Sequence, residues 1–178
     1  MSEPPAGLHN LDLLAIYCND HLAASVGGIE LVRRMLDVHR NTPYAPALEQ
    51  LLTELHGENE ALRSTMAALG LPVQRYKQVA LWLGEKASRL KLNGRLVSRS
   101  PLSDLVEFEF LASAVRAKRS GFESLREVAD ADERLDKEQL NGLVEQANRQ
   151  HEWLTATRRE VAARVFGGND HAADQAAD

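Results

Sequence analysis

The amino-acid sequence predicts an all-α protein in which four long helices form a bundle, with a shorter crossover helix between the second and third long helices. No stretch alternates apolar and polar residues with the period of two that a half-buried β-strand shows. Apolar residues instead recur every three or four positions over long segments. Only 6 prolines and 11 glycines interrupt the 178 residues, so these periodic segments are long.

The first two helices are separated by a short break around Thr42 and Pro43. We expect the first helix over residues 8–40 and the second over residues 44–69. Thr42 suits the N-cap of the second helix, and Pro43 suits its first position, where an N–H would have no partner within the helix. Gly70 follows the second helix, where a left-handed backbone commonly ends a helix.

The later breaks along the chain predict three further helices, over residues 73–92, 101–128 and 136–166. The 73–92 helix is the shorter one and would connect two helix pairs, as in bundles with one long crossover. An uninterrupted up-and-down bundle of five helices is the alternative. Outside the single domain of residues 8–166, we expect a flexible N-terminus at 1–7 and a disordered C-terminal tail at 167–178.

The composition is that of a soluble protein with a substantial core. Hydrophobic residues make up 44% of the chain and charged residues 26%. No apolar run approaches the ~18 residues needed to cross a bilayer, and the N-terminus lacks the basic and apolar regions of a signal peptide. The single cysteine, Cys18, excludes an intramolecular disulfide framework and a multi-cysteine metal site. We therefore expect a cytoplasmic protein with no membrane span.

Polar residues interrupt the apolar stripe of each long helix. On the first helix, Asp20 falls at the centre of the stripe, beside small residues that would let a helix or a ligand approach closely. Because a buried acid is costly unless it is paired, we predict that Asp20 pairs with Arg63 or Arg116 in a buried network that fixes helix register. The predicted members of this network are Asp20, Asn59, Arg63, Glu109, Arg116 and Gln150.

The same inward acids also suit a metal centre. Its predicted ligands are Asp20, Glu30, Glu58 and Glu109, with His21 or His151, and its ion would be iron or manganese. With long helices, a crossover and inward carboxylates on three helices, the chain resembles the ferritin-like superfamily. The resemblance implies a two-metal site, which in that family is built from a Glu on each of two helices and a Glu-x-x-His pair on each of the other two.

The chain departs from the ferritin-like pattern at this defining motif. Glu58 is followed three positions later by Ala61, and Glu145 is followed by Asn148, so neither helix carries Glu-x-x-His. The resemblance therefore covers residues 8–69 and 101–166 by architecture alone. Arginines near the same faces favour the ion-pair network over the metal centre, because a two-metal cavity rarely tolerates guanidinium charge. We therefore expect no cofactor.

Residues 77–99 carry six cations against one acid, although the whole chain has a net charge of −5. Five of the cations form a predicted basic surface, off the apolar stripe of the crossover helix and just beyond it: Lys86, Arg89, Lys91, Arg95 and Arg99. This surface either binds an anionic partner or is a solvated face that balances acids on the next helix. Nucleic acid is not expected, because the chain shows no binding module and is acidic overall.

These features together predict a non-catalytic binding or interaction protein that assembles as a homo-oligomer. One alternative is a di-metal carboxylate oxidoreductase or a metal-storage protein that uses the inward acids. The other is an anion- or nucleic-acid-associated factor that acts through the basic surface. The chain contains no Gly-rich phosphate loop, nucleophile elbow or H-E-x-x-H motif, so these common catalytic signatures do not support an enzyme.

Overall fold

The computed structural model describes Leu8, residues 10–74 and residues 100–167. Within these residues it contains four long helices, a short 3-10 turn and no strand. The helices are α1 (Leu11–His39), α2 (Ala45–Ala68), α4 (Pro101–Val128) and α5 (Lys137–Phe166), and the turn is η2 (Ala129–Ala131). The predicted all-α class and the four long helices are therefore confirmed.

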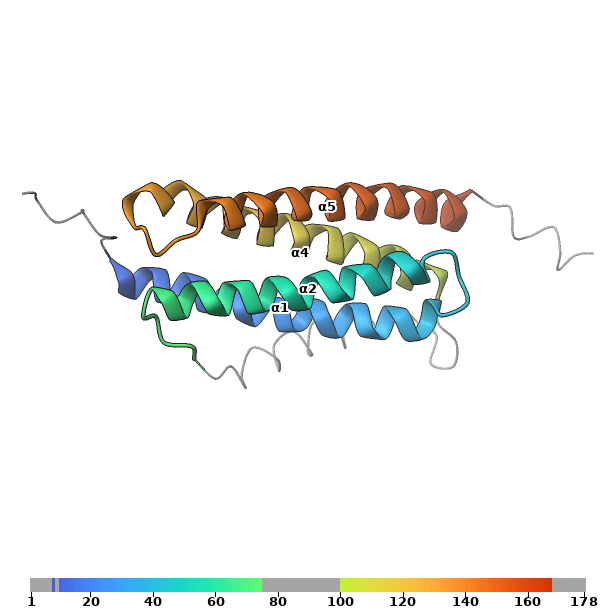
Figure 1. Ribbon diagram of the computed structural model, residues 1–178. Helices are drawn as coiled ribbons and strands as arrows, with labels where there is room; N and C mark the ends of the chain where they lie inside the picture. The colour runs from blue at the N-terminus through green and yellow to red at the C-terminus, as the bar shows by residue number, and fades with distance from the viewer. Residues whose placement is uncertain (1–7, 9, 75–99, 168–178) are drawn as a thin grey trace, which may run out of the picture.

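Two helical hairpins lie against each other in this fold (Figure 1). α1 and α2 form one antiparallel pair, α4 and α5 form the other, and α1 also packs on α4. α2 ends where α1 begins, whereas α4 begins at the opposite end of the bundle, beside the α1–α2 turn. Apart from Val73 and Gln74, the predicted 73–92 helix lies outside the described residues, as does the whole basic surface.

The helix ends show how local sequence sets the element boundaries. Gly70 has a φ of 71°, and its N–H donates to Ala67 O at 3.0 Å while Leu71 N–H donates to Met66 O at 2.8 Å. This pair of bonds is the Schellman arrangement, so the predicted end of α2 is confirmed. Ser100 caps α4 by accepting from Leu102 N–H, and Asp136 caps α5 by accepting from Gln139 N–H.

The predicted N-cap of α2, Thr42, is wrong by two residues. The helix begins at Ala45, and Tyr44 occupies the N-cap position without a side-chain cap. The Thr42 hydroxyl instead donates to His39 O at 2.9 Å, and it accepts from Tyr44 N–H at 3.3 Å. Thr42 therefore closes the last turn of α1 and shapes the connection, because its hydroxyl finds partners on both sides of the turn.

The core consists of two apolar clusters, one towards each end of the bundle. The first includes Met35, Leu48, Phe108 and Leu154, and the second includes Cys18, Leu22, Met66, Phe122 and Leu140. On α2 the clusters meet between Leu55 and Leu62, and on α4 they meet between Val115 and Phe122. The residues at these two junctions, Glu58 and Lys118, are polar, so a polar layer separates the two halves of the core.

Candidate functional site

The polar layer joins three helices through one buried ion pair. Glu58 on α2 is only 3% exposed, and one of its carboxylate oxygens accepts a hydrogen bond from the Lys118 ammonium on α4. Lys118 also donates to the side-chain oxygen of Gln150 on α5. The second carboxylate oxygen of Glu58 accepts from Gln150 at 2.9 Å and from Gln146 at 2.8 Å. The Glu58 charge is thus compensated by one cation and two amide donors.

Burial dominates the electrostatics of this layer. Desolvation lowers the pKa of Lys118 below its ordinary value, and the nearby Glu58 carboxylate opposes that shift. Gln150 links the layer to Glu54, to which it donates at 2.7 Å. Because its polar groups bond one another, the layer holds α2, α4 and α5 in one register, as buried polar groups do in helical assemblies.

A pocket of about 310 Å³ opens next to the polar layer, between α1, α2 and α4. Its walls are mainly apolar and include Leu55, Leu62, Val115, Phe122 and Leu125. Small residues on α1 and α4 leave the space open, because Ala24, Gly28, Ala114, Ala117 and Gly121 all line it. Glu58 and Lys118 also line it, so the pocket combines an apolar interior with a charged wall.

His21 enters the pocket wall by packing over a glycine. A Cβ built on Gly121 would lie only 2.7 Å from His21 Cε1, so any other residue at this position would displace the His21 ring. The His21 ring also meets the Tyr17 ring edge-on, with 4.7 Å between the centroids. Burial lowers the pKa of His21 below its ordinary value, and the charge of Asp20 opposes this shift. Burial of the ring therefore favours the neutral imidazole.

Cys18 is the buried thiol of this pocket. The residue is 1% exposed, and burial raises its pKa to about 11. At neutral pH the side chain is consequently a thiol and not the nucleophilic thiolate. Cys18 contributes to the apolar wall and carries no sign of nucleophilic activation.

The prediction that Asp20 points into the core is wrong, because Asp20 is exposed at the pocket rim. Its neighbour Asn19 is the inward polar residue on this helix, with 0% exposure. The Asn19 amide donates to Ala15 O at 2.7 Å and to Pro72 O at 2.9 Å, and its oxygen accepts from Gln74 N–H at 2.9 Å. Asn19 therefore attaches the chain that follows α2 to α1.

The other predicted network residues divide between the interior and the surface. Gln150 is buried in the polar layer, while Asn59 and Arg63 are half-buried and joined by a 2.8 Å hydrogen bond. The predicted inward positions of Glu109 and Arg116 are wrong, because both side chains are exposed and Glu109 pairs with Arg158 at 3.2 Å. The observed network is centred on Glu58 and Lys118 and does not include Asp20.

The predicted metal ligands do not form one group in the described part of the chain. Glu30 is exposed and pairs with Arg33, Glu58 pairs with Lys118, and His21 and His151 are half-buried on different helices. Nowhere in residues 10–74 and 100–167 do three or more His, Cys, Asp or Glu side chains lie close enough to hold a metal ion. The predicted convergence fails because Glu30 and Glu109 lie on outer faces of their helices.

Sequence reasoning missed Lys118, Gln146 and Glu54. The signal for Lys118 was present on α4, where buried residues follow one another at alternating steps of three and four: Phe108, Leu111, Val115, Phe122 and Leu125. Lys118 fills the one gap in this series. The pattern has the 3.5-residue period of packed bundle helices, whereas the prediction used the 3.6-residue period of an isolated helix.

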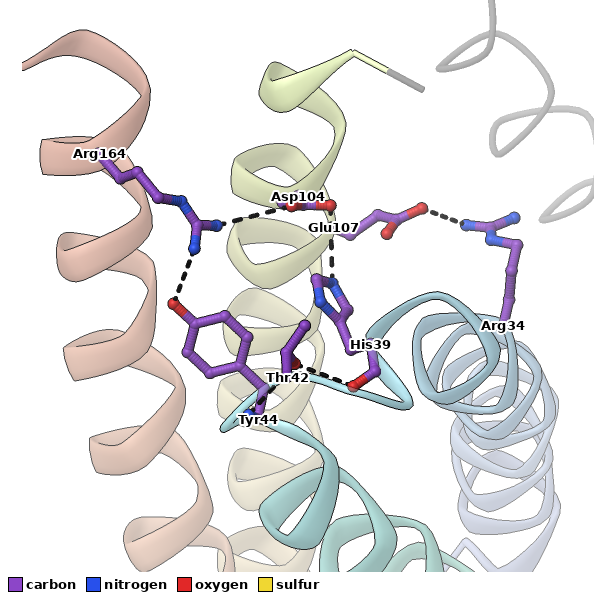
Figure 2. A network of polar contacts seen from close by, with 7 residues as sticks. All are labelled: Arg34, His39, Thr42, Tyr44, Asp104, Glu107 and Arg164. Atoms are coloured by element: carbon purple, nitrogen blue, oxygen red, sulfur yellow. Dashed lines mark hydrogen bonds and ion pairs between the residues drawn. The ribbon is translucent and has the colours of Figure 1, made fainter. Parts of the chain in front are cut away.

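A second set of polar contacts lies at the end of the bundle that contains the α1–α2 turn (Figure 2). His39, at the end of α1, is buried with its Nε2 3.6 Å from Asp104 Oδ1 on α4. Arg164 of α5 reaches Asp104 at 3.6 Å and the Tyr44 hydroxyl at 3.5 Å, and Arg34 pairs with Glu107 at 3.2 Å. These contacts connect both hairpins, so this end network has a structural role.

Comparisons with protein-family models, curated proteins and solved structures find no match to this chain. Among the described helices, none is long and apolar enough to cross a membrane. The functional argument therefore depends on the polar layer and on the pocket beside it.

Proposed function

We propose that the protein is a non-catalytic binding protein that holds a small, largely apolar molecule in the pocket between α1, α2 and α4. The observation that carries this proposal is a pocket of about 310 Å³ with apolar walls and a few fixed polar groups. Ligand sites in proteins commonly enclose ~300–1,000 Å³ and combine these two kinds of lining, and the space between bundle helices is one of their usual places.

The polar layer supports binding over catalysis. Lys118, Glu58 and Gln150 are bonded to one another, so they set the shape of the pocket wall. A general acid or base must reach the substrate with the atom that transfers the proton. The Lys118 ammonium and the Glu58 carboxylate are already bonded to each other. Cys18, the one cysteine of the chain, has its pKa raised to about 11, which disfavours covalent catalysis through its sulfur.

The test is binding of a neutral, environment-sensitive naphthylamine dye to the full chain. Ala114→Leu places a larger side chain in the pocket and should weaken dye binding at least about tenfold, or ~1.4 kcal/mol. The matched control is Ala156→Leu, on the exposed face of α5. Equal dye affinity in the wild-type protein and both variants would mean that the dye binds elsewhere, and the proposal would fail.

The connectivity of the helices supports a ferritin-like architecture as part of this proposal. α2 and α4 run in the same direction, and the chain between them starts at one end of the bundle and finishes at the other. A bundle with one long crossover has this connectivity. Assembly as a homo-oligomer, a cytoplasmic location and an anionic partner at Lys86, Arg89, Lys91, Arg95 and Arg99 stay predictions from the sequence.

A further inference from the structure

Among the described residues, no cation pairs with the Asp20 carboxylate at the rim of the pocket. Asp20 is exposed and lines the pocket, and among the described residues its one electrostatic neighbour is His21. Burial lowers the pKa of His21 and so favours its neutral form over a cation that would pair with Asp20. Asp20 therefore presents a negative charge at the mouth of a pocket whose walls are mainly apolar.

The charge inside the pocket is already balanced. Glu58 and Lys118 form an ion pair at the wall, so they add no net charge. The described lining residues together carry one negative charge, which comes from Asp20. Tyr17, a half-buried residue on the same turn of α1, also lines the mouth. Aromatic rings attract cations, so Tyr17 and Asp20 favour the same kind of ligand group.

A carboxylate ligand fits this pocket poorly. Within the described part of the chain, the one lining ammonium is that of Lys118, which already donates to Glu58 and to Gln150. A ligand carboxylate that captured Lys118 would leave Glu58 buried without its cation, and an uncompensated buried charge is strongly destabilising. The pocket thus selects against anionic molecules at its wall as well as at its rim.

We infer that the pocket binds a small amphiphile that has an apolar body and one cationic amine head. The body lies between Leu62, Phe122 and Leu125, and the ammonium lies at the mouth beside Asp20 and Tyr17. This inference rests on the proposed function, because it names the chemical class of ligand for the same pocket.

The test uses three probes with the same eight-carbon chain and different heads: octylammonium, octanol and octanoate. Their affinities for the full-length protein are measured at pH 7 by displacement of the neutral dye. Octylammonium should bind best and octanoate worst. An exposed or half-exposed ion pair accounts for roughly a threefold to fivefold preference of the amine over the alcohol.

Asp20→Asn should remove the preference for the amine and leave the affinity for octanol unchanged. The matched control is Asp12→Asn, an exposed position earlier on α1 that does not line the pocket, and it should keep the preference. The advantage of the amine in the wild-type protein should also shrink as salt is raised, because salt screens exposed charges.

The possible outcomes separate this inference from the proposed function. If all three probes bind equally, in wild type and Asp20→Asn alike, the head-group inference is overturned while the binding proposal stands. Tighter binding of octanoate would overturn it too and would point to Lys118 as the contact. If neither the dye nor any of the probes binds the full chain, the pocket is filled or closed and both proposals fail.

Discussion

At the scale of single residues, the molecule depends on a charged pair in an apolar core. Lys118 occupies a core position between Val115 and Phe122, where a bundle helix ordinarily carries an aliphatic side chain. It is tolerated there because the Glu58 carboxylate and the Gln150 side-chain oxygen accept hydrogen bonds from its ammonium. Such a pair contributes little net stability, but each partner depends strongly on the other.

Lys118→Met should therefore destabilise the protein by about 3–5 kcal/mol, because Glu58 is left buried without a cation. The double variant Lys118→Met with Glu58→Leu should recover most of that loss, since no charge is then buried. Urea unfolding followed by circular dichroism measures both. Lys137→Met, which breaks an exposed pair with Asp130, is the control and should change stability by less than ~1 kcal/mol. A double variant as unstable as the single one would contradict this account.

His21 makes the stability of the folded protein depend on pH. Its pKa is lowered in the folded protein, so below ~6.5 the unfolded chain binds a proton that the folded chain takes up less readily. Stability should thus fall as pH is lowered from 7 through 6.5 towards the folded-state pKa. His21→Gln should flatten this decline, whereas exposed His56→Gln should not. NMR titration of the His21 ring measures the shift directly, and a midpoint at or above 6.5 would refute it.

At the scale of helices, boundaries are set by backbone chemistry at a few positions. Gly70 ends α2 because its positive φ of 71° is readily accessible to glycine and strained for other residues. The resulting Schellman turn brings Leu71 back onto the second apolar cluster, beside Met66. From there the chain reaches Asn19, which holds it against α1.

Two glycines of the α2 region should respond in opposite directions to alanine. Gly70→Ala should cost about 1–2 kcal/mol, because its left-handed backbone disfavours a Cβ even though space is open around it. Gly57→Ala, inside the helix and exposed, should stabilise by roughly 0.5–1 kcal/mol, since alanine is the better helix former. Thermal and urea unfolding report both. The same sign for the two variants would be inconsistent with the observed end of α2.

At the scale of the whole molecule, each of the two apolar clusters contains residues of all four long helices, whereas the polar layer and the end network connect particular helices. The polar layer links α2 with α4 and α5, and the end network links α1 and the α1–α2 turn with α4 and α5. The predicted metal ligands lie apart across this arrangement. We therefore expect the fold to be independent of metal.

Metal removal tests this expectation on the full chain. Protein purified without chelator or metal-binding tag should contain far less than one equivalent of iron or manganese, and dialysis against EDTA should leave its Tm unchanged. The physical reason is that Glu58 is neutralised by Lys118, while Glu30 and Glu109 pair with arginines. One or two equivalents of metal, lost in Glu58→Gln, would instead establish the metal-centre alternative.

The sequence predicts the helices well because their signals are local. Ser100 and Pro101 start α4, and Gly70 and Gly167 follow the last residues of their helices, all within a few positions of the predicted ends. The apolar periodicity predicts the helical segments between these ends, since it depends only on residues that are close in the sequence. The start of α2 was misplaced because Thr42 has two possible partners, and the turn geometry decides between them.

The candidate site was predicted only in part, and the errors have one cause. An angular drift of a few degrees per residue becomes a full position along a long helix. Because of this drift, the prediction placed Asp20 in the core where the structure places Asn19. It also placed Glu109 and Arg116 too far inward and did not identify Lys118 as a core position. Gln150 was predicted in the buried network, and Glu58 was predicted as an inward acid but assigned to the metal centre; both lie close to well-defined leucine positions on their helices.

The sequence by itself therefore determined the all-α class, the four long helices and most of their ends, because these depend on contacts within a few residues. The tertiary structure alone decided which polar groups meet. It paired Glu58 with Lys118 across 60 positions of chain, turned Asp20 to the rim and opened a pocket where small residues of α1 and α4 face each other. Such contacts depend on the rotation and register of packed helices, which no local pattern specifies.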